Sequence, residues 1–181
     1  MEELVHESLD TTLEYEERHY GDTWWAKTTL TVTGQLDLIH HVTEGLARLK
    51  RYREGLNQKQ ENIAEKLPVL LRVQCDGDDC EQNRFVLYQY IGDGSNADPP
   101  NSTVDSVNVE KWMAFEAFVR PFEHLEEDDN FISEARNLRA FLAEFHVGCY
   151  YYDDFYYLAN YDGVENLWKQ RNEIWFIKQT D

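Results

Sequence analysis

The sequence is poor in cysteine, in proline and in positive charge. It has three cysteines, an odd number that argues against the paired disulfide framework of a small secreted protein. No apolar run approaches the ~18 residues that a membrane-spanning helix needs. The first residues are acidic rather than apolar, so no secretion signal is expected. We therefore expect a cytoplasmic protein that does not enter membranes.

Signatures of enzymes are also absent. The sequence has no HExxH, GxSxG, Walker or GxGxxG motif. His40 and His41 are neighbours, so on a helix they point about 100° apart and cannot both face one metal ion. Cys75 and Cys80 are too widely spaced for a usual zinc pair, and we interpret them as free thiols in a polar hairpin loop. We expect no catalysis, no metal and no cofactor.

One short motif instead suggests an enzyme that binds a metal ion. The pattern Glu14-x-Glu16-x-Arg18 resembles the ExExK signature of the triphosphate-tunnel (CYTH) family, with arginine where that family has lysine. The resemblance covers five residues and implies a metal ion and a triphosphate held inside an eight-stranded barrel. The chain lacks the many basic residues on strands that such a tunnel needs. A metal-dependent enzyme acting on a phosphate-containing substrate through Glu14 and Glu16 is therefore the third hypothesis.

Helical periodicity is clearest in residues 36–67, where apolar residues recur at steps of three, four and seven. Pro68 ends this predicted helix, and its centre is basic (Arg48, Lys50, Arg51, Arg53). A second helix is predicted over 130–145. The apolar residues of 107–125 fit either a helix or a buried strand, and we favour a helix ending near Arg120, because proline follows.

Strand-like runs occupy the remaining apolar segments. Residues 11–20 and 24–33 flank Gly21-Asp22 and predict a hairpin. Residues 69–75 and 84–91 predict a second strand pair, and 172–179 a closing strand. The prediction is an α+β fold: an antiparallel sheet of about five strands packed against three or four helices. It forms a single compact domain over residues 1–181, with a flexible loop at 92–103 and no visible internal repeat.

Acidic and aromatic residues are what the chain has in abundance. Asp and Glu number 35 against 17 Lys and Arg, which gives a formal net charge of −18. Residues 76–134 alone hold fifteen acidic and three basic residues. Spaced carboxylates can imitate a phosphate backbone, and tyrosines can anchor a protein partner. The predicted contact surface consists of Asp76, Asp78, Asp79, Glu81, Glu123, Glu126, Glu127, Asp128, Asp129, Tyr151, Asp153, Asp154 and Tyr156.

The leading hypothesis is an acidic inhibitor that imitates DNA. Its partner would be a protein with a basic nucleic-acid-binding groove, such as a nuclease, a CRISPR effector or a restriction enzyme. Phage anti-CRISPR and anti-restriction proteins offer the analogy, which rests on charge and size. Direct binding to nucleic acid is disfavoured because like charges repel.

The alternative is an interaction or scaffold domain whose acidity only serves solubility. Its contact surface would be the basic helix, and that helix would also allow a homodimer, because its charge complements the acidic remainder of the chain.

Overall fold

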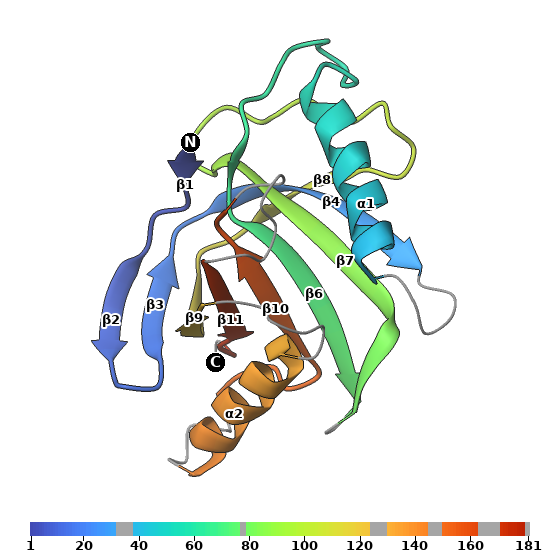
Figure 1. Ribbon diagram of the computed structural model, residues 1–181. Coiled ribbons are helices and arrows are strands. Elements are labelled where there is room, and N and C mark those ends of the chain that lie inside the picture. Colours follow the sequence, from blue (N-terminus) through green and yellow to red (C-terminus); the bar gives the residue numbers. More distant parts are fainter. Residues whose placement is uncertain (32–37, 77–78, 124–129, 145–149, 163–170, 180–181) are drawn as a thin grey trace.

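The computed structural model describes residues 1–31, 38–76, 79–123, 130–144, 150–162 and 171–179, and every structural statement concerns these parts. The elements in chain order are β1 (Glu2–Glu3), β2 (Glu7–Thr11), β3 (Glu16–Tyr20), β4 (Thr23–Thr31), α1 (Leu38–Arg53), β5 (Lys66–Leu67), β6 (Val69–Asp76), β7 (Asp79–Asp93), β8 (Asn108–Trp112), β9 (Phe115–Phe122), α2 (Asn130–Glu144), β10 (Phe155–Asn160) and β11 (Asn172–Ile177) (Figure 1).

Nine strands share one antiparallel sheet in the order β2-β3-β9-β11-β10-β6-β7-β4-β8. The expectation of about five strands packed against three or four helices is therefore wrong, and the described residues form two helices. The apolar segments contain more strand than expected, because 107–125 holds β8 and β9 and the tyrosine-rich segment holds β10. The β6–β7 pair, helix α2 and strand β11 confirm three predictions.

The sheet consists of two halves with the same connectivity. In one half the chain runs β4–α1–β6–β7, with β5 of the small second sheet just before β6, and the strands lie in the order β6-β7-β4. In the other it runs β9–α2–β10–β11, and the strands lie in the order β10-β11-β9. The inner strands β6 and β10 pair antiparallel and join the halves. The repeat escaped the sequence because alternation on a strand can be met by many different apolar residues.

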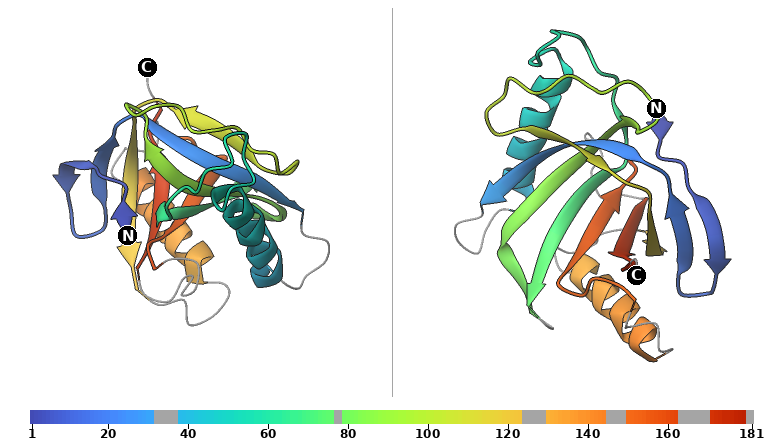
Figure 2. Two further views of the ribbon diagram at one scale, coloured as in Figure 1. Left: turned by 90° about the horizontal axis from the view of Figure 1, so that it is seen from above. Right: turned by 180° about the vertical axis from the view of Figure 1, so that it is seen from behind.

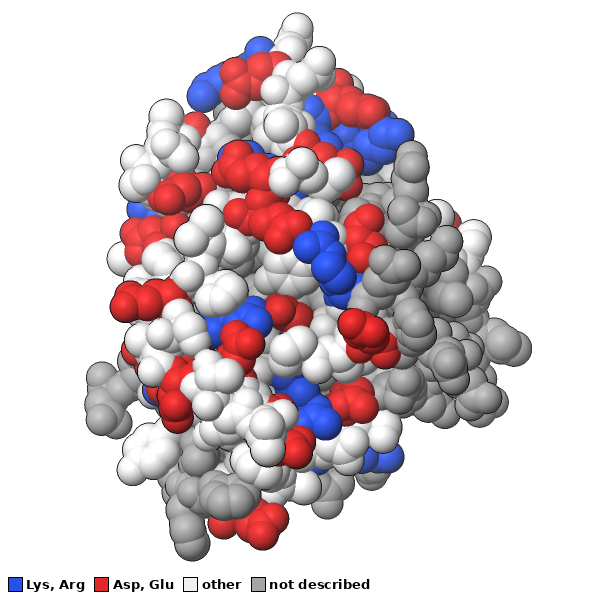
Figure 3. Space-filling model, turned by 60° about the vertical axis from the view of Figure 1, so that its left-hand side comes forward, with Lys and Arg blue, Asp and Glu red and all other residues white. Residues whose placement is uncertain are grey.

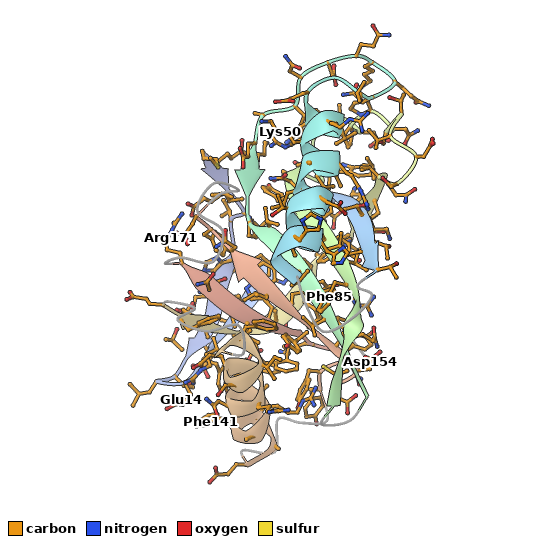
Figure 4. The ribbon with its side chains drawn as sticks, turned by 45° about the vertical axis from the view of Figure 1, so that its right-hand side comes forward. Glu14, Lys50, Phe85, Phe141, Asp154 and Arg171 are labelled. Atoms are coloured by element: carbon orange, nitrogen blue, oxygen red, sulfur yellow. The ribbon has the colours of Figure 1, made fainter. Side chains whose placement is uncertain are left out.

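Both helices cover the same face of the curved sheet (Figure 2). Their inward side chains join strand residues such as Phe85, which lies beside α1 in Figure 4, in one buried cluster. Because successive strand residues point to opposite faces, every second residue belongs to the other side of the sheet. That second face is covered by aromatic rings, and its buried residues include Tyr20, Trp25, Tyr88, Tyr157 and Trp175.

Helix α1 is shorter than predicted and ends at Arg53. Gly55 stops it by adopting φ = 103°, a left-handed conformation that glycine accepts without strain. The amide of Leu56 then donates to the carbonyl of Arg51 at 3.1 Å, and the amide of Gly55 to that of Tyr52 at 3.4 Å. Apolar residues after Gly55 keep the helical spacing in the sequence, but the helix itself ends at Arg53.

The predicted hairpin around Gly21-Asp22 is also wrong. Strand β3 pairs with β2 and β9, whereas β4 pairs with β7 and β8. The Gly-Asp pair therefore marks a crossing between the two halves. Asp22 holds this crossing in place, because its carboxylate accepts a hydrogen bond from the Ala114 amide at 2.9 Å and pairs with Lys111 at 3.1 Å.

The loop predicted at 92–103 begins at the end of β7, which extends to Asp93. Hydrogen bonds connect it to other parts of the chain. The Gly94 amide donates to the Asp22 carbonyl at 2.7 Å, and the Tyr52 hydroxyl donates to the Pro100 carbonyl at 2.9 Å. Asn101 accepts from the Gln58 amide at 2.9 Å. The loop thus runs alongside the segment that follows α1.

Gly45 sets the distance between α1 and the sheet. A Cβ atom at this position would lie 2.6 Å from Leu87 Cδ1 and 2.7 Å from Leu30 Cδ2. Both leucines are buried, so neither methyl has free space to move into. We expect Gly45→Ala to lower the free energy of unfolding by about 1–3 kcal/mol through overpacking. Urea denaturation measures this change.

The matched control is Ala47→Gly on the exposed side of the same helix. Helix propensity alone favours alanine over glycine by about 1 kcal/mol. Gly45→Ala should therefore destabilise the protein by overpacking, although helix propensity favours alanine at this position. A gain in stability after Gly45→Ala would show that α1 can shift away from the sheet.

Candidate functional site

A cavity of about 540 Å³ opens where the N-terminal segment passes over the aromatic face of the sheet. Glu3, Leu4 and His6 line it from that segment, and residues near the ends of β3, β9 and β11 line it from the sheet. Arg171, just before β11, lies at the same edge of the molecule as β1 (Figure 4). A cavity of this size lies within the range of about 300–1,000 Å³ that is common for small-molecule sites.

Backbone pairing holds the N-terminal segment in place over the cavity. β1 pairs in parallel with β5, and the Leu4 amide donates to the Leu67 carbonyl at 2.8 Å. The Leu4 side chain is buried in the aromatic cluster. Beyond it, β2 pairs with β3, so the short segment between β1 and β2, which contains Leu4 and His6, forms one wall of the cavity.

An ion network lies at the inner wall of the cavity. Arg18 Nε donates to Glu16 Oε2 at 2.7 Å, and Arg18 Nη1 donates to Glu173 Oε1 at 2.8 Å. Strand β9 separates β3 from β11, and it presents Ala117 and Val119 on this face. Their short side chains leave room for Arg18 to reach across to Glu173.

The network is largely removed from water. The Arg18 side chain is 7% exposed and that of Glu173 is 13% exposed. The second oxygen of Glu173 accepts a hydrogen bond from the Trp175 indole at 2.7 Å. Burial alone would lower the pKa of Arg18, but the charge of Glu173 raises it, and the net shift is upward. Arg18 therefore stays positively charged.

His6 lies against this network, with its ring 5.6 Å from that of Tyr20. His6 is exposed on one side, but its partial burial lowers its pKa, and the positive charge of Arg18 lowers it further. The opposing effects of Glu173 and Glu16 are smaller. His6 therefore has a neutral imidazole at neutral pH, and its unprotonated ring nitrogen can accept a hydrogen bond or bind a metal ion.

Tyr161 and Arg171 form the opposite side of the opening. The Arg171 guanidinium donates to the Tyr161 carbonyl, lies 5.8 Å from the Tyr161 ring and pairs with Glu3 at 2.9 Å. Burial, followed by the charge of Glu173, raises the pKa of Tyr161, so its hydroxyl stays protonated. Pro121 and Phe122 add apolar surface beside it. The cavity thus combines apolar walls, one neutral imidazole and two guanidinium groups.

Among the residues predicted from the sequence, only Glu123 lines this cavity. Asp153 and Asp154 are exposed elsewhere, and in Figure 4 Asp154 lies far from Arg171. Tyr151 and Tyr156 are buried, 5% and 0% exposed, and pack in the core on the helix side. Asp76, Asp79 and Glu81 belong to β6 and β7, without described side chains, and Asp78, Glu126, Glu127, Asp128 and Asp129 lie outside the described residues.

The visible surface does not form one acidic patch. On the face that Figure 3 shows, acidic side chains alternate with basic and uncharged ones. The Lys178 ammonium, for example, contacts both Glu17 and Glu116. The sequence does not predict this pairing of opposite charges, because the three residues are far apart in the chain.

The carboxylates of the Glu14-x-Glu16-x-Arg18 motif are paired with arginines. Glu14 contacts Arg120, which also pairs with Glu134 at 2.8 Å. Glu16 pairs with Arg18 as described above. No group of three metal-ligating side chains occurs in the described part of the chain. The expectation of free thiols is wrong for Cys75, which is disulfide-bonded.

Sequence reasoning missed most residues of the cavity, among them His6, Tyr161, Arg171 and Glu173. A usable signal was present for Glu173, a single charged residue inside the apolar strand NEIWFI. Arg18 belongs to the Glu14-x-Glu16-x-Arg18 motif, whose resemblance suggested a role in binding a triphosphate. His6 carried no local signal, because its importance comes from the strands that lie around it.

A cavity of this size, with apolar walls and a few polar side chains, has the form of a small-molecule site. A family model described as "SOUL heme-binding protein" matches residues 1–177. The chain belongs to the SOUL heme-binding protein family.

Relatives in this family resemble the chain over most of its length. Heme-binding protein 2 of Homo sapiens is 26% identical over 167 residues, covering 92% of this chain and 79% of the relative. Heme-binding protein 1 of Xenopus laevis is 27% identical over 135 residues, covering 75% of this chain and 70% of the relative. A solved structure described as a hydrolase from Listeria innocua has a TM-score of 0.57 at 7% identity, covers 94% of both chains and shows the fold alone.

The family overturns the leading hypothesis from the sequence. A DNA-imitating inhibitor and its partner with a basic nucleic-acid-binding groove are wrong, because the family and its relatives are described by heme binding. High negative charge is a property of the whole composition and does not identify a binding site.

Neither of the two described helices has the length and the apolar composition that a membrane span requires.

The buried ion network generates a prediction about stability. Arg18→Met should lower the free energy of unfolding by about 3–5 kcal/mol, because it leaves the Glu173 carboxylate buried without its cation. The double variant Arg18→Met/Glu173→Gln should show a smaller decrease in the free energy of unfolding, because no buried charge is left without a partner. Urea denaturation of both variants measures the difference.

Arg51→Met is the matched control, because Arg51 is exposed on α1. Its effect should stay within about 0.5 kcal/mol. If Arg18→Met and Arg51→Met lowered the free energy of unfolding equally, the network would have no structural role.

Proposed function

We propose that this protein binds heme in the cavity between its N-terminal segment and the aromatic face of the sheet. The observation that carries the proposal is the position of the His6 imidazole on a wall of that cavity. Its lowered pKa is consistent with a neutral ring. Membership in the SOUL heme-binding family and the names of the relatives supply the ligand class. The role is binding rather than catalysis, and the cytoplasmic location expected from the sequence stays a prediction.

The side chains of the cavity fit an iron porphyrin. Histidine is a common axial ligand of heme iron, and it must be neutral to bind the metal. The macrocycle is flat and apolar, and Leu4, Pro121, Phe122 and the ring of Tyr161 offer apolar surface of that kind. Bound heme would supply an iron centre that accepts a nitrogen ligand.

The chain's own residues prepare the site in two ways. Partial burial, followed by the charge of Arg18, lowers the pKa of His6, so the imidazole is available as a ligand at neutral pH. Glu173 and Glu16 fix the Arg18 guanidinium from two sides and keep that charge in place. The buried Leu4 side chain and the Tyr20 ring, stacked 4.8 Å from Trp175, exclude water behind the cavity.

The first test is His6→Ala. Loss of the imidazole should weaken hemin binding by at least about tenfold, since removal of even an indirect contact to a metal ligand costs about 10–100-fold. The Soret absorption band of the remaining complex should also change, because it reports the axial ligand. Titration of the protein into hemin, followed by absorption spectroscopy, measures both.

His19→Ala is the matched control. His19 lies on β3 next to Arg18, so its side chain points to the opposite face of the sheet, where it is 41% exposed and lies 3.9 Å from Glu116. Its removal should leave affinity and spectrum unchanged. If His19→Ala loses the wild-type spectrum while His6→Ala keeps it, the cavity is not the heme site.

A further inference from the structure

One wall of the cavity, the N-terminal segment (residues 1–6), lies outside the nine-stranded sheet. Its strand β1 belongs to a separate two-stranded sheet with β5. Across the cavity, Arg18 on β3 and Glu173 on β11 belong to strands that pair with neighbours on both sides. The N-terminal segment can therefore move without breaking any strand pairing of the large sheet.

Few contacts attach this segment to the rest of the molecule. Strand β1 consists of two residues, and the Leu4 amide adds one hydrogen bond to the Leu67 carbonyl at 2.8 Å. Leu4 is the only buried residue among the six, whereas Met1 and Val5 are 73% and 81% exposed. Segments with few buried apolar contacts open locally at a much lower free-energy cost than core strands.

Two ion pairs add to this attachment. Glu2 pairs with Lys66 at 2.8 Å, and Glu3 pairs with Arg171 at 2.9 Å. The side chains of Glu2, Glu3 and Arg171 are 59%, 43% and 55% exposed. Exposed pairs contribute little to stability, because water and salt screen them. The buried side chain of Leu4 is therefore the main anchor of the segment.

The floor beneath the segment is held together by its own contacts. The ring of Tyr20 stacks on Phe115 and on Trp175, with centroids 4.9 Å and 4.8 Å apart. Arg18 is fixed by its hydrogen bond to Glu173 at 2.8 Å. None of these contacts involves residues 1–6. Departure of the N-terminal segment would therefore leave the sheet and its ion network in place.

The segment also has a defined point at which it can bend. Strand β2 begins at Glu7, which pairs with His19 of β3. Between Leu4 and Glu7 lie Val5 and His6, which are exposed and belong to no strand. Rotation about the backbone of these two residues can carry Leu4 out of the aromatic cluster while β2 stays paired with β3.

We propose that residues 1–6 form a hinged cover of the cavity, and that withdrawal of Leu4 from the aromatic cluster opens the cavity for its ligand. When the cover closes again, it separates the cavity from water, as lids of binding sites do. The inference rests on the proposed function for the ligand that enters, and it adds how entry is controlled. The nine-stranded sheet keeps its structure in both states.

Hydrogen exchange followed by NMR tests the cover without any ligand. The Leu4 amide should exchange at least about tenfold faster than the amides of β11, which is paired on both sides. Leu4→Ala should raise the exchange rate at this position at least about tenfold further, because it removes the main anchor. Val5→Ala is the matched control, since Val5 is exposed, and it should change the rate less than about twofold. Exchange in β11 should stay unchanged in both variants.

A crosslink that keeps the cover closed tests the entry of a ligand. Glu2 and Lys66 are register partners whose side chains meet, so Glu2→Cys/Lys66→Cys places two cysteines where a disulfide can form. The crosslinked protein should take up hemin at least about tenfold more slowly than Glu2→Ser/Lys66→Ser, which lacks the same ion pair but can open. Stopped-flow absorption measures the rate, and peptide mass spectrometry confirms the crosslink.

The outcomes distinguish the cover from the proposed function. If the Leu4 amide exchanges as slowly as those of β11, or if Leu4→Ala and Val5→Ala have the same effect, the segment is not a cover. Equal rates of hemin uptake by the crosslinked protein and the serine variant also overturn the inference, and they leave the proposed function standing. If the wild-type protein binds no hemin, the proposed function is wrong, and hydrogen exchange alone decides whether the segment opens.

Discussion

A sheet with two apolar faces needs two coverings, and in the described part of this chain the helices cover only one face. The other face is filled by the aromatic side chains of its own strands, including Tyr20, Tyr88 and Trp175. Large rings can cover such a face because each buries about 150–250 Å². The N-terminal segment closes one end of this face with Leu4. The cavity exists because this second covering is thinner than a helix.

The same constraint explains why charged residues lie so deep. Arg18 and Glu173 occupy strand positions whose neighbours, Tyr20 and Trp175, are fully buried. A charge in such a position is tolerated when it is paired and hydrogen-bonded. Glu173 meets this condition through Arg18 and the Trp175 indole. Removing one partner of this pair would therefore be costly. The pKa of His6 is lowered first by its partial burial and then by the charge of Arg18.

The sequence was informative where structure depends on local spacing. The apolar spacing of Phe131, Ala135, Leu138 and Leu142 predicted α2, and the alternation around Phe85 and Leu87 predicted β7. It failed where the partner of a segment decides its structure. Residues 107–125 have enough apolar positions for either a helix or strands, and pairing with β3, β4 and β11 selects the strands.

The candidate site illustrates the same limit more sharply. Arg18 and Glu173 are separated by 155 positions in the sequence, and no local pattern relates them. The prominence of acidic residues directed attention to 126–129 and to Asp153-Asp154, because charge density can be read from composition alone. A binding cavity is instead defined by which strands are neighbours. That order, with β9 between β3 and β11, is a property of the whole sheet.

Acidity and heme binding are compatible once their energetic sources are separated. A bond between a neutral imidazole and iron, and the contact of a macrocycle with apolar walls, depend little on the net charge of the protein. Charge instead affects the approach and orientation of an anionic ligand, over distances that salt shortens. In this chain the cations near the cavity are held by Glu16, Glu173, Glu3 and Asp162. On the proposal that heme binds in this cavity, His6 and the apolar walls are the groups that would contribute affinity.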